Sequence, residues 1–232
     1  MLPVTLQQVN KRYQLDSVAV PALADINLEI LPQRFTVLSG PSGSGKTTLL
    51  NLIGCIDLPD SGQITVAGEN VQQLSDSALA DFRLRHIGFV FQNFNLLPVL
   101  SAFENIEYPL LLAKVARPAR HKRVKMLLDA VGLSEKSQHL PGQLSGGQRQ
   151  RVAIARALAT QPQWVLADEP TANLDSHTGA SIIALMRQMQ RELAVSFIFS
   201  SHDPQVLAAA DDAVLIRDGR IVAIERKMAV AS

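Results

Sequence analysis

The sequence lacks several features that would place the protein in a specialised class. Its 232 residues contain one cysteine, Cys55, which excludes an intramolecular disulfide and suits a reducing compartment. No run approaches the roughly 18 apolar residues of a membrane span, and the first residues lack the basic stretch and apolar core of a secretory signal. We expect a protein of the cytoplasm, which could still attach to the cytoplasmic side of a membrane through a partner. Cys55 is expected to be a buried, small apolar residue.

An excess of positive charge is also missing. The chain has 22 Lys and Arg residues against 21 Asp and Glu residues, a formal net charge of +1. Proteins that bind nucleic acid normally carry a clustered basic excess, so we expect no nucleic-acid partner. With 47% hydrophobic and 19% charged residues, the composition is that of a globular chain long enough for one large domain or a domain with a subdomain.

Apolar residues that alternate with polar ones indicate half-buried antiparallel strands in three places. In "ADINLEI", Ile26, Leu28 and Ile30 alternate with polar neighbours. "SGQITVAG" and "AVLIRDGRIVAI" look similar, and the second contains Asp218-Gly219, a hairpin-turn pair.

Three other runs, "FTVLSG", "WVLADE" and "SFIFSSH", are continuously apolar before they end in polar residues. Such runs followed by helical patterns favour buried parallel strands. Ligands of open α/β sheets bind at the carboxyl ends of these strands, which is where the polar residues stand here.

Strand signals vanish between about Asn93 and Thr160. "SAFENIEYPLLLAKVA", "RPARHKRVKMLLDAVGL" and "SGGQRQRVAIARALAT" predict helices instead, with Pro118 near one start and Gly132 near one end. These helices look like an insertion into an α/β core.

The predicted fold class is therefore α/β, with a core built on a parallel sheet, an antiparallel β subdomain and a helical insertion. We expect a single domain over residues 1–232. Its α/β core with the β subdomain covers 1–92 and 161–232, and its helical subdomain covers 93–160.

"GPSGSGKT" fits G-x-x-x-x-G-K-[ST], between an apolar strand and a helical pattern. Its glycines let the backbone wrap phosphate oxygens, and the helix start adds N–H groups and a positive dipole end. Lys46 should reach the β and γ phosphates and the Thr47 hydroxyl should ligate Mg²⁺. The alternative is a flexible loop, but the strand and helix around it favour a P-loop that binds a nucleoside triphosphate, and so a P-loop NTPase core. The residues of this expected site are Gly40, Pro41, Ser42, Gly43, Ser44, Gly45, Lys46, Thr47 and Thr48.

Polar residues at other strand ends are candidates for the chemistry. Asp168 is expected to hold Mg²⁺ through water, and Glu169 beside it to act as general base on an attacking water. His202 is placed to stabilise charge on a γ-phosphate, and Gln92 to ligate Mg²⁺ or orient water. The alternative interpretations are that the two acids begin a surface loop, that the histidine is structural, and that the glutamine has no special role at its strand end.

"LSGGQ" resembles a second phosphate-binding helix start. Ser145 and Gln148 fit a capping box, but that explanation leaves Gly146 and Gly147 unexplained. Glycine disfavours a helix by roughly 1 kcal/mol relative to Ala, so it suggests close approach of a ligand to the backbone. The dipole end favours an anion. Because the P-loop already holds a nucleotide, a twofold dimer is the simplest arrangement, in which each second loop covers the phosphate of the other chain.

The motifs "GPSGSGKT", Gln92, "LSGGQ", "VLADEP", "NLD" and His202, in this order, resemble the nucleotide-binding subunit of ABC transporters. The resemblance covers essentially the whole chain. It implies a homodimer with ATP sandwiched between the subunits, with Glu169 as catalytic base and His202 as γ-phosphate sensor. The "LSGGQ" sequence is the signature of this family, and the resemblance implies that four of its residues contact the nucleotide: Ser145, Gly146, Gly147 and Gln148.

The resemblance also gives roles to two residues that their own chemistry leaves open. Asp175, in "NLD", would lie in the loop that communicates across the dimer. Tyr13, in "KRY", matches the family's adenine-stacking aromatic, although the residue alone fits a core or a surface position equally well.

Within the family, "GCIDLPDSGQI" and "LADEPTANLD" resemble the macrolide-exporter and lipoprotein-release group. An integral membrane permease subunit would then dock near Phe94–Leu100, although the composition of this segment fits a core helix start nearly as well. The segment lacks the histidine pair associated with lipoprotein release, which puts that substrate in doubt.

The resulting expectation is an ATPase that uses ATP and Mg²⁺ to drive a membrane partner, through export or mechanical work on the far side of the membrane. One alternative is a mechanical signalling or cell-division type of ABC ATPase without transport. Another is a soluble ABC ATPase of DNA repair or translation, which the near-neutral charge disfavours.

Overall fold

The structure is a computed structural model that describes residues 1–15 and 18–227. It divides into two compact units, one formed by residues 1–80 with the segment from Ser196 onward, and one by Asp81–Val195. Each unit is described by itself. The expected extent of a helical subdomain, 93–160, remains a prediction.

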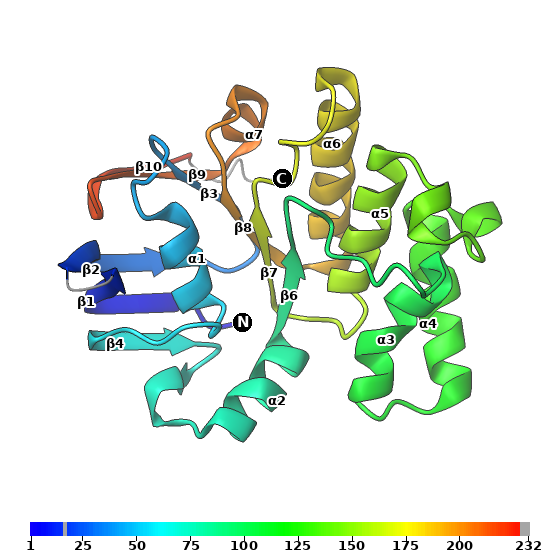
Figure 1. The fold of residues 1–232 in the computed structure, drawn as a ribbon, viewed down its shortest axis with the longest axis horizontal. Helices are drawn as coiled ribbons and strands as arrows, with labels where there is room; N and C mark the ends of the chain where they lie inside the picture. The colour runs from blue at the N-terminus through cyan, green and yellow to red at the C-terminus, as the bar shows by residue number, and fades with distance from the viewer. Residues whose placement is uncertain (16–17, 228–232) are drawn as a thin grey trace. The chain divides into compact units, whose positions relative to one another are not determined.

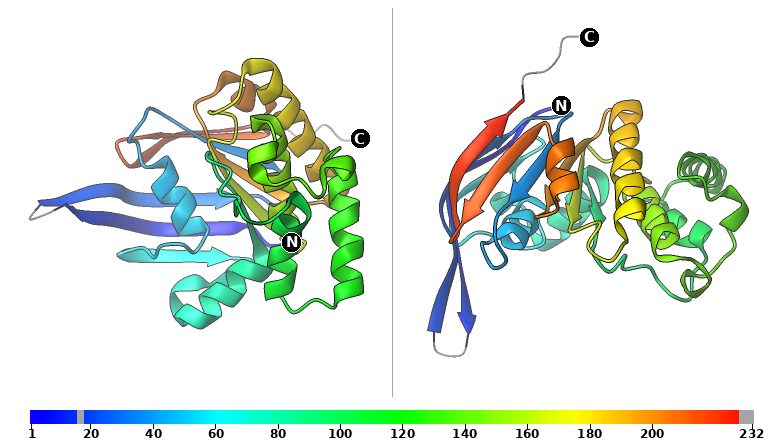
Figure 2. Two further views of the ribbon diagram at one scale, coloured as in Figure 1. Left: turned by 45° about the vertical axis from the view of Figure 1, so that its right-hand side comes forward. Right: turned by 90° about the horizontal axis from the view of Figure 1, so that it is seen from above.

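The first unit contains a four-stranded sheet in the order β2-β1-β4-β5. β1 pairs with β2 and β4 in antiparallel register, which sets Leu6 opposite Leu28 and Ile64 (Figures 1 and 2). Ile26, Leu28 and Ile30 are buried, so the predicted alternation is confirmed. The strands are β1 (Val4–Leu15), β2 (Val18–Ile30), β4 (Ser61–Val66) and β5 (Glu69–Asn70).

A second group of strands in this unit leads to the phosphate loop. β3 (Phe35–Ser39) lies between β8 (Ser196–Ser200) and β9 (Asp212–Arg217) and is parallel to both. β10 (Arg220–Arg226) returns antiparallel to β9. The turn between them has left-handed φ angles of 50° and 71° at Asp218 and Gly219, as a tight hairpin requires.

Three aromatic rings fill the middle of this group. The centroids of Phe35 and Phe199 are 4.1 Å apart, and Phe197 lies 5.9 Å from Phe35 and 5.8 Å from Phe199. All three side chains are fully buried. The helices of the unit are α1 (Lys46–Ile53) and α7 (Pro204–Ala209), with a 3₁₀ turn η1 (Val71–Gln73).

The second unit joins a parallel strand pair to helices. α2 (Asp76–His86) crosses the junction of the units and leads into β6 (Ile87–Val90), which pairs in parallel with β7 (Trp164–Asp168). Gly88 allows the close packing of β6 on α5, because a Cβ there would stand 2.2 Å from the carbonyl oxygen of Ala157.

The predicted helices are confirmed, and α3, α4 and α5 pack together (Figure 1). Ser101 caps α3 with a capping box, Pro118 stands in the first turn of α4, and Gly132 follows the end of α4 with φ of 70°. The helical elements of the unit are α3 (Ala102–Leu112), α4 (Arg117–Ala130), η2 (Ser134–Lys136), η3 (Pro141–Gln143), α5 (Gly146–Ala157) and α6 (Ser176–Leu193).

Among the residues that the structure describes, no helix has both the length and the apolar character that crossing a bilayer requires. Cys55 is buried, as its composition-based interpretation predicted.

The aromatic cluster generates a prediction about stability. Phe197→Ala removes a fully buried ring and leaves a cavity, so we expect the free energy of unfolding to fall by about 3–5 kcal/mol. The measurement is equilibrium denaturation by urea. Val222→Ala, at a half-exposed position of β10, is the control and should change the free energy by less than about 0.5 kcal/mol.

Candidate nucleotide-binding site

The loop between β3 and α1 contains three glycines with left-handed φ angles, 146° at Gly40, 75° at Gly43 and 102° at Gly45. A Cβ at Gly40 would stand 2.0 Å from the oxygen of Ile216, and one at Gly45 would stand 2.7 Å from the oxygen of Ala22. At Gly43 it would meet no described atom within 4 Å. Two of the glycines are therefore required by packing, and the third faces open space.

Polar groups of this loop point to an anionic ligand. The Lys46 ammonium donates to the oxygens of Gly40 and Pro41, at 2.9 and 2.8 Å, and the residue is only 8% exposed. The buried Ser44 hydroxyl has no hydrogen-bond partner among the described residues, and no side chain there caps the start of α1. A polyphosphate would satisfy the hydroxyl, the helix-start N–H groups and the ammonium together, so the residues present fit the predicted ligand.

His202 leaves the sheet at the same edge as the phosphate loop. β3 and β8 are parallel, with Leu38 opposite Ser200, and the Ser201 N–H donates to the oxygen of Leu38 at 3.1 Å. His202 itself is exposed. The structure thus brings together the loop and the histidine that the sequence predicts at neighbouring strand ends.

Tyr13 is linked to α1 by hydrogen bonds of its hydroxyl group. The phenol donates to Asp57 Oδ2 at 2.9 Å, and Thr48 hydrogen-bonds the same hydroxyl. Lys11 Nζ donates to Asp57 Oδ1 at 2.7 Å and lies 5.2 Å from the centroid of the Tyr13 ring. Burial, followed by the bond to Asp57, raises the pKa of Tyr13. Burial acts to raise the pKa of Asp57, but hydrogen bonds from Lys11 and Tyr13 hold it below its ordinary value.

In the second unit, the two predicted acids stand at the end of β7. Asp168 is the last residue of the strand, and Glu169 follows with a φ of 43°. A non-glycine residue in the left-handed region costs about 1–2 kcal/mol. The Glu169 carbonyl accepts from the N–H of Ala172 at 3.2 Å and closes the turn. Strain of this kind can occur at functional positions, and here it turns the chain directly after the two acids, where β7 ends.

Gln92 follows the strand next to β7. Because β6 and β7 are parallel, with Val90 opposite Ala167, Gln92 leaves the pair at the same edge as the acids. The amide of Asn173 donates to the oxygen of Gln92 and to Asn93 Oδ1, both at 3.0 Å. Asn173 therefore ties the segment after Gln92 to the loop after Glu169, a contact that the sequence did not reveal.

The start of α5 has the capping box predicted from "LSGGQ". The Gln148 side chain accepts from the N–H of Ser145 at 2.9 Å, and Ser145 Oγ accepts from the N–H of Gln148 at 3.3 Å. A Cβ at Gly147 would stand 2.6 Å from Thr178 Cγ2, whereas one at Gly146 would be in ordinary contact with Leu174. The packing against α6 thus requires a glycine at 147, in addition to any ligand that approaches the backbone.

Asp175 caps the neighbouring helix. Its carboxylate accepts from the N–H of Thr178 at 2.9 Å at the start of α6. A hydrogen bond from the Thr178 side chain, followed by the one from this N–H, lowers the pKa of Asp175. Since Thr178 also contacts Gly147, the "LSGGQ" and "NLD" motifs lie side by side.

The segment after Gln92 is held from α5. Phe94 and Asn95 have left-handed φ angles of 62° and 47°, and the Arg156 guanidinium donates to both of their carbonyl oxygens. Burial lowers the pKa of Arg156, and Arg149 lies 5.1 Å from the Phe94 ring. The role of Arg156 was not predicted from the sequence. The signal that could have indicated it is a charged residue one helical turn after Val152, on the buried face of α5.

The rest of the segment is fixed by Asn105. Its amide accepts from the N–H of Leu97 at 2.8 Å and donates to the oxygens of Leu97 and Leu100. The segment is not helical, so the alternative of a core helix start is wrong. Val99 is 81% exposed and Leu97 41%, which leaves apolar side chains outward on a constrained backbone.

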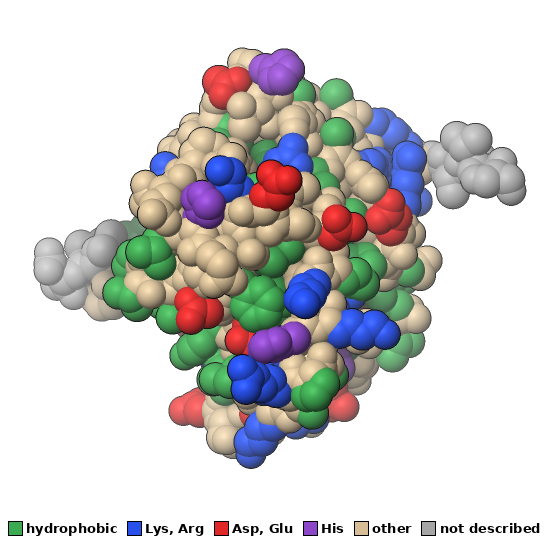
Figure 3. Space-filling view, turned by 90° about the vertical axis from the view of Figure 1, so that its right-hand side faces the viewer, with side chains coloured by type: hydrophobic (Ala, Val, Ile, Leu, Met, Phe, Trp, Pro, Cys, Tyr) green, Lys and Arg blue, Asp and Glu red, His purple; other side chains and the backbone are tan. Residues whose placement is uncertain are grey.

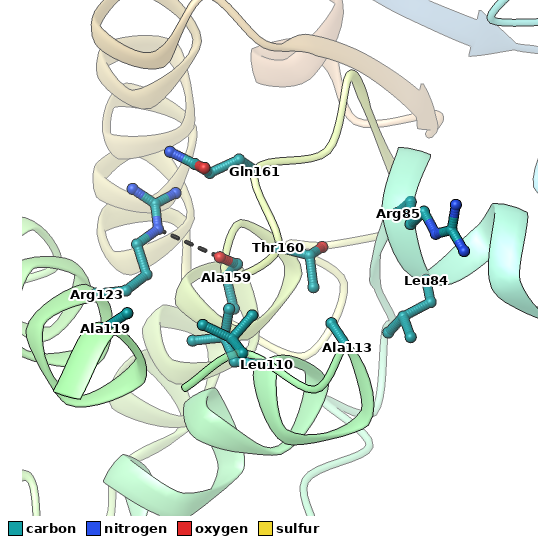
Figure 4. A pocket seen from close by; sticks show the side chains of 10 residues that line it. Leu84, Arg85, Leu110, Ala113, Ala119, Arg123, Ala159, Thr160 and Gln161 are labelled. Atoms are coloured by element: carbon teal, nitrogen blue, oxygen red, sulfur yellow. Dashed lines mark hydrogen bonds between the residues drawn. The ribbon is translucent and has the colours of Figure 1, made fainter. Parts of the chain in front are cut away.

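A separate pocket of about 270 Å³ lies in the second unit (Figure 4). Leu110 of α3, Ala113 directly after α3 and Arg123 of α4 form part of its wall. Arg123 Nε donates to the oxygen of Ala159, so the guanidinium caps the carboxyl end of α5. None of the predicted site residues line this pocket. On the face drawn in Figure 3, acidic and basic side chains are interspersed, in keeping with the near-zero net charge.

Comparison with known proteins gives consistent matches. The sequence model of the family described as ABC transporter matches residues 23–172. An uncharacterized ABC transporter ATP-binding protein of Thermotoga maritima is 47% identical over 222 residues, which cover 96% of this chain and 94% of that protein. The macrolide export ATP-binding/permease protein MacB of Sodalis glossinidius is 44% identical over 96% of this chain, which spans only 34% of its length.

A solved structure agrees with the fold. The dimeric post-hydrolysis state of the ATP-binding cassette MJ0796, bound to ADP and Pi, superposes with a TM-score of 0.89 at 40% identity. The match covers 97% of this chain and 99% of the solved one.

The hydrogen bonds from Arg156 to the carbonyl oxygens of Phe94 and Asn95, called the Arg156 clamp below, generate a prediction. Arg156→Met keeps the length of the side chain but removes the two charge-assisted hydrogen bonds, so we expect the free energy of unfolding to fall by about 1.5–3 kcal/mol. The amide hydrogens of residues 94–97 should also exchange faster with deuterium. Lys125→Met removes a charge from the exposed side of α4 and should leave both measurements unchanged; equal effects of the two variants would contradict the clamp.

Proposed function

The chain belongs to the ABC transporter family and is an ATP-binding ATPase of that family. We propose that two copies of it close around two Mg-ATP molecules to drive a membrane permease. The observation that carries the proposal is the pair of glycine-containing helix starts, at α1 and α5. The first encloses an ammonium and an unpartnered hydroxyl, and the second exposes a polar capping box.

The first loop is proposed to hold the triphosphate of ATP. The N–H groups at the start of α1 and the ammonium of Lys46 would bind its oxygens, and the buried Ser44 hydroxyl would gain a partner. The Lys46 ammonium now donates to the carbonyl oxygens of Gly40 and Pro41. When ATP binds, phosphate oxygens would replace these acceptors, so the ammonium would keep its hydrogen bonds.

Thr47, Gln92 and Asp168 are proposed as the metal-binding residues. Hydroxyl, amide and carboxylate oxygens are the hard ligands that Mg²⁺ prefers, so this donor set fits the ion. When bound, Mg²⁺ neutralises charge that develops on the phosphates.

Glu169 is proposed to take the proton of the attacking water. Glu169 stands directly after β7, beside the proposed metal-binding Asp168, where a carboxylate can accept a proton from a water molecule. His202, on an adjacent strand end to the phosphate loop, is proposed to donate a hydrogen bond to the γ-phosphate.

The start of α5 is proposed to cover the nucleotide of the other copy, with Asp175 beside it at the interface. The positive end of the α5 dipole favours the phosphates, and the close contact of Gly147 with Thr178 fixes this end of α5 against α6. The related cassette MJ0796 is dimeric in its post-hydrolysis state, which supports the arrangement. Loss of the γ-phosphate would remove the charge that bridges the two copies, so dimer geometry follows hydrolysis.

The partner is proposed to be an integral membrane permease that docks on Phe94–Leu100. Arg156 and Asn105 hold the backbone of this segment while Val99 remains exposed, so docking costs little ordering of the chain. In the MacB relatives the matching part occupies about a third of a longer ATP-binding/permease protein. We propose that here the cassette lies on the cytoplasmic side of the membrane, held there by the permease, and that the work is export or extracytoplasmic mechanical work.

Glu169→Gln tests the hydrolytic mechanism. Loss of the general base should lower the turnover number about 10²–10⁴-fold while ATP still binds, so an ATP-bound dimer should accumulate in size-exclusion chromatography. Lys46→Ala should instead weaken nucleotide binding itself. Near-normal hydrolysis by the Glu169→Gln chain would remove this residue as base.

Val99→Glu tests the docking segment. A charge on the exposed apolar side chain should abolish copurification of the membrane partner from detergent-solubilised native membranes, as measured by mass spectrometry. ATP binding should not change. Val222→Glu, on an exposed position of β10, is the matched control. Recovery of ribosomes or DNA-repair proteins in place of a permease would contradict the membrane assignment.

A further inference from the structure

We infer that Asp57 is a positioning residue for recognition of the nucleotide base, because it accepts a hydrogen bond from the Tyr13 hydroxyl and so holds the ring of this β1 residue in place for stacking. The inference rests on the proposed binding of ATP and on the stacking role that the family resemblance implies for Tyr13, and adds to them the residue that positions the ring. Its class of ligand is a purine nucleotide, recognised by the face of the base.

The hydrogen bonds of this group connect the ring to α1 at two points. Thr48, in the first turn of α1, hydrogen-bonds the Tyr13 hydroxyl. Asp57 follows α1, and its backbone N–H and that of Ile56 both donate to the oxygen of Asn51, at 3.4 and 2.9 Å. Since the phosphate loop leads into α1, the ring is hydrogen-bonded to residues in and directly after the helix that also carries the phosphate-binding groups.

Lys11 completes the group by holding Asp57 in turn. Its ammonium is shared between Asp57 Oδ1 and the oxygen of Leu58, at 2.7 and 2.8 Å, and Asp57 Oδ1 also accepts from the Leu58 N–H at 2.8 Å. The carboxylate is thus fixed by three donors, including the phenol of Tyr13. Its orientation is set before any ligand arrives.

Tyr13 needs this support because it projects from a strand and is 39% exposed. A ring that rotates freely has to be ordered when the ligand binds, which weakens binding. The bonds to Asp57 and Thr48 remove that freedom in advance. Stacking on an aromatic face does not read the edge of the base, so the platform should accept guanine as well as adenine.

The test compares ligands with and without a base. Tyr13→Phe keeps the ring and removes the hydroxyl that Asp57 and Thr48 hold. We expect the dissociation constant of ADP to rise about two- to tenfold by calorimetry, the cost of ordering one side chain on binding. Inorganic tripolyphosphate, measured by its inhibition of the ATPase, should be unaffected. Tyr108→Phe, at the other tyrosine of the chain, is the matched control and should bind ADP normally.

A double-mutant cycle separates positioning from general damage. Asp57→Ala should weaken ADP binding as Tyr13→Phe does, and the double variant should be no worse than either single one. Additive effects, or normal ADP binding by Tyr13→Phe, would overturn the inference. Equal loss of ADP and tripolyphosphate binding would also overturn it, because it indicates a damaged phosphate loop. If neither ligand binds the unaltered chain, the proposed function has failed instead.

Discussion

Parallel pairing of short buried strands is the constraint on which the site depends. Strands that run in the same direction end at the same edge, so the residues that follow them have to gather there. β3 and β8 place the phosphate loop and His202 together in one unit. β6 and β7 place Gln92 beside Asp168 in the other. The strands themselves carry mostly apolar side chains, and the proposed chemistry lies with the residues at their carboxyl ends.

α5 has a comparable role among the loops of the second unit. Its first turn carries the capping box, and in the next turn the buried Gln150 amide donates to the oxygen of Pro170, in the loop after Glu169. Near its end, Arg156 holds the segment after Gln92. One helix therefore contacts the acid loop and the proposed docking segment, so a displacement of α5 would be felt at both. In the proposed complex with nucleotide and permease, these hydrogen bonds would connect the two sites through α5.

Three of the twelve non-glycine residues with left-handed φ angles in the described part of the chain stand in or beside the proposed functional segments. Glu169, Phe94 and Asn95 are all left-handed without being glycine, and each stands one or a few residues after a strand or beside a proposed functional residue. The cost of each is offset by a neighbour: the Ala172 N–H for Glu169 and the Arg156 guanidinium for the other two. A chain that needed only a compact fold would gain stability by relaxing these positions.

The sequence by itself determined the local features of this protein. Glycines and lysine of the phosphate loop, the acids after an apolar run, the capping box and the hairpin turn are each encoded within a few residues, and each appears in the structure where it was expected. Tertiary structure alone decided the contacts of Arg156 with Phe94, of Asn173 with Gln92 and of Asp57 with Tyr13. These pairs are 62, 81 and 44 residues apart, so packing rather than local propensity brings them together. Gly147 is a further example. The sequence suggested that this glycine makes room for a ligand, whereas the tertiary structure shows Thr178 of α6 packed where a Cβ of residue 147 would lie.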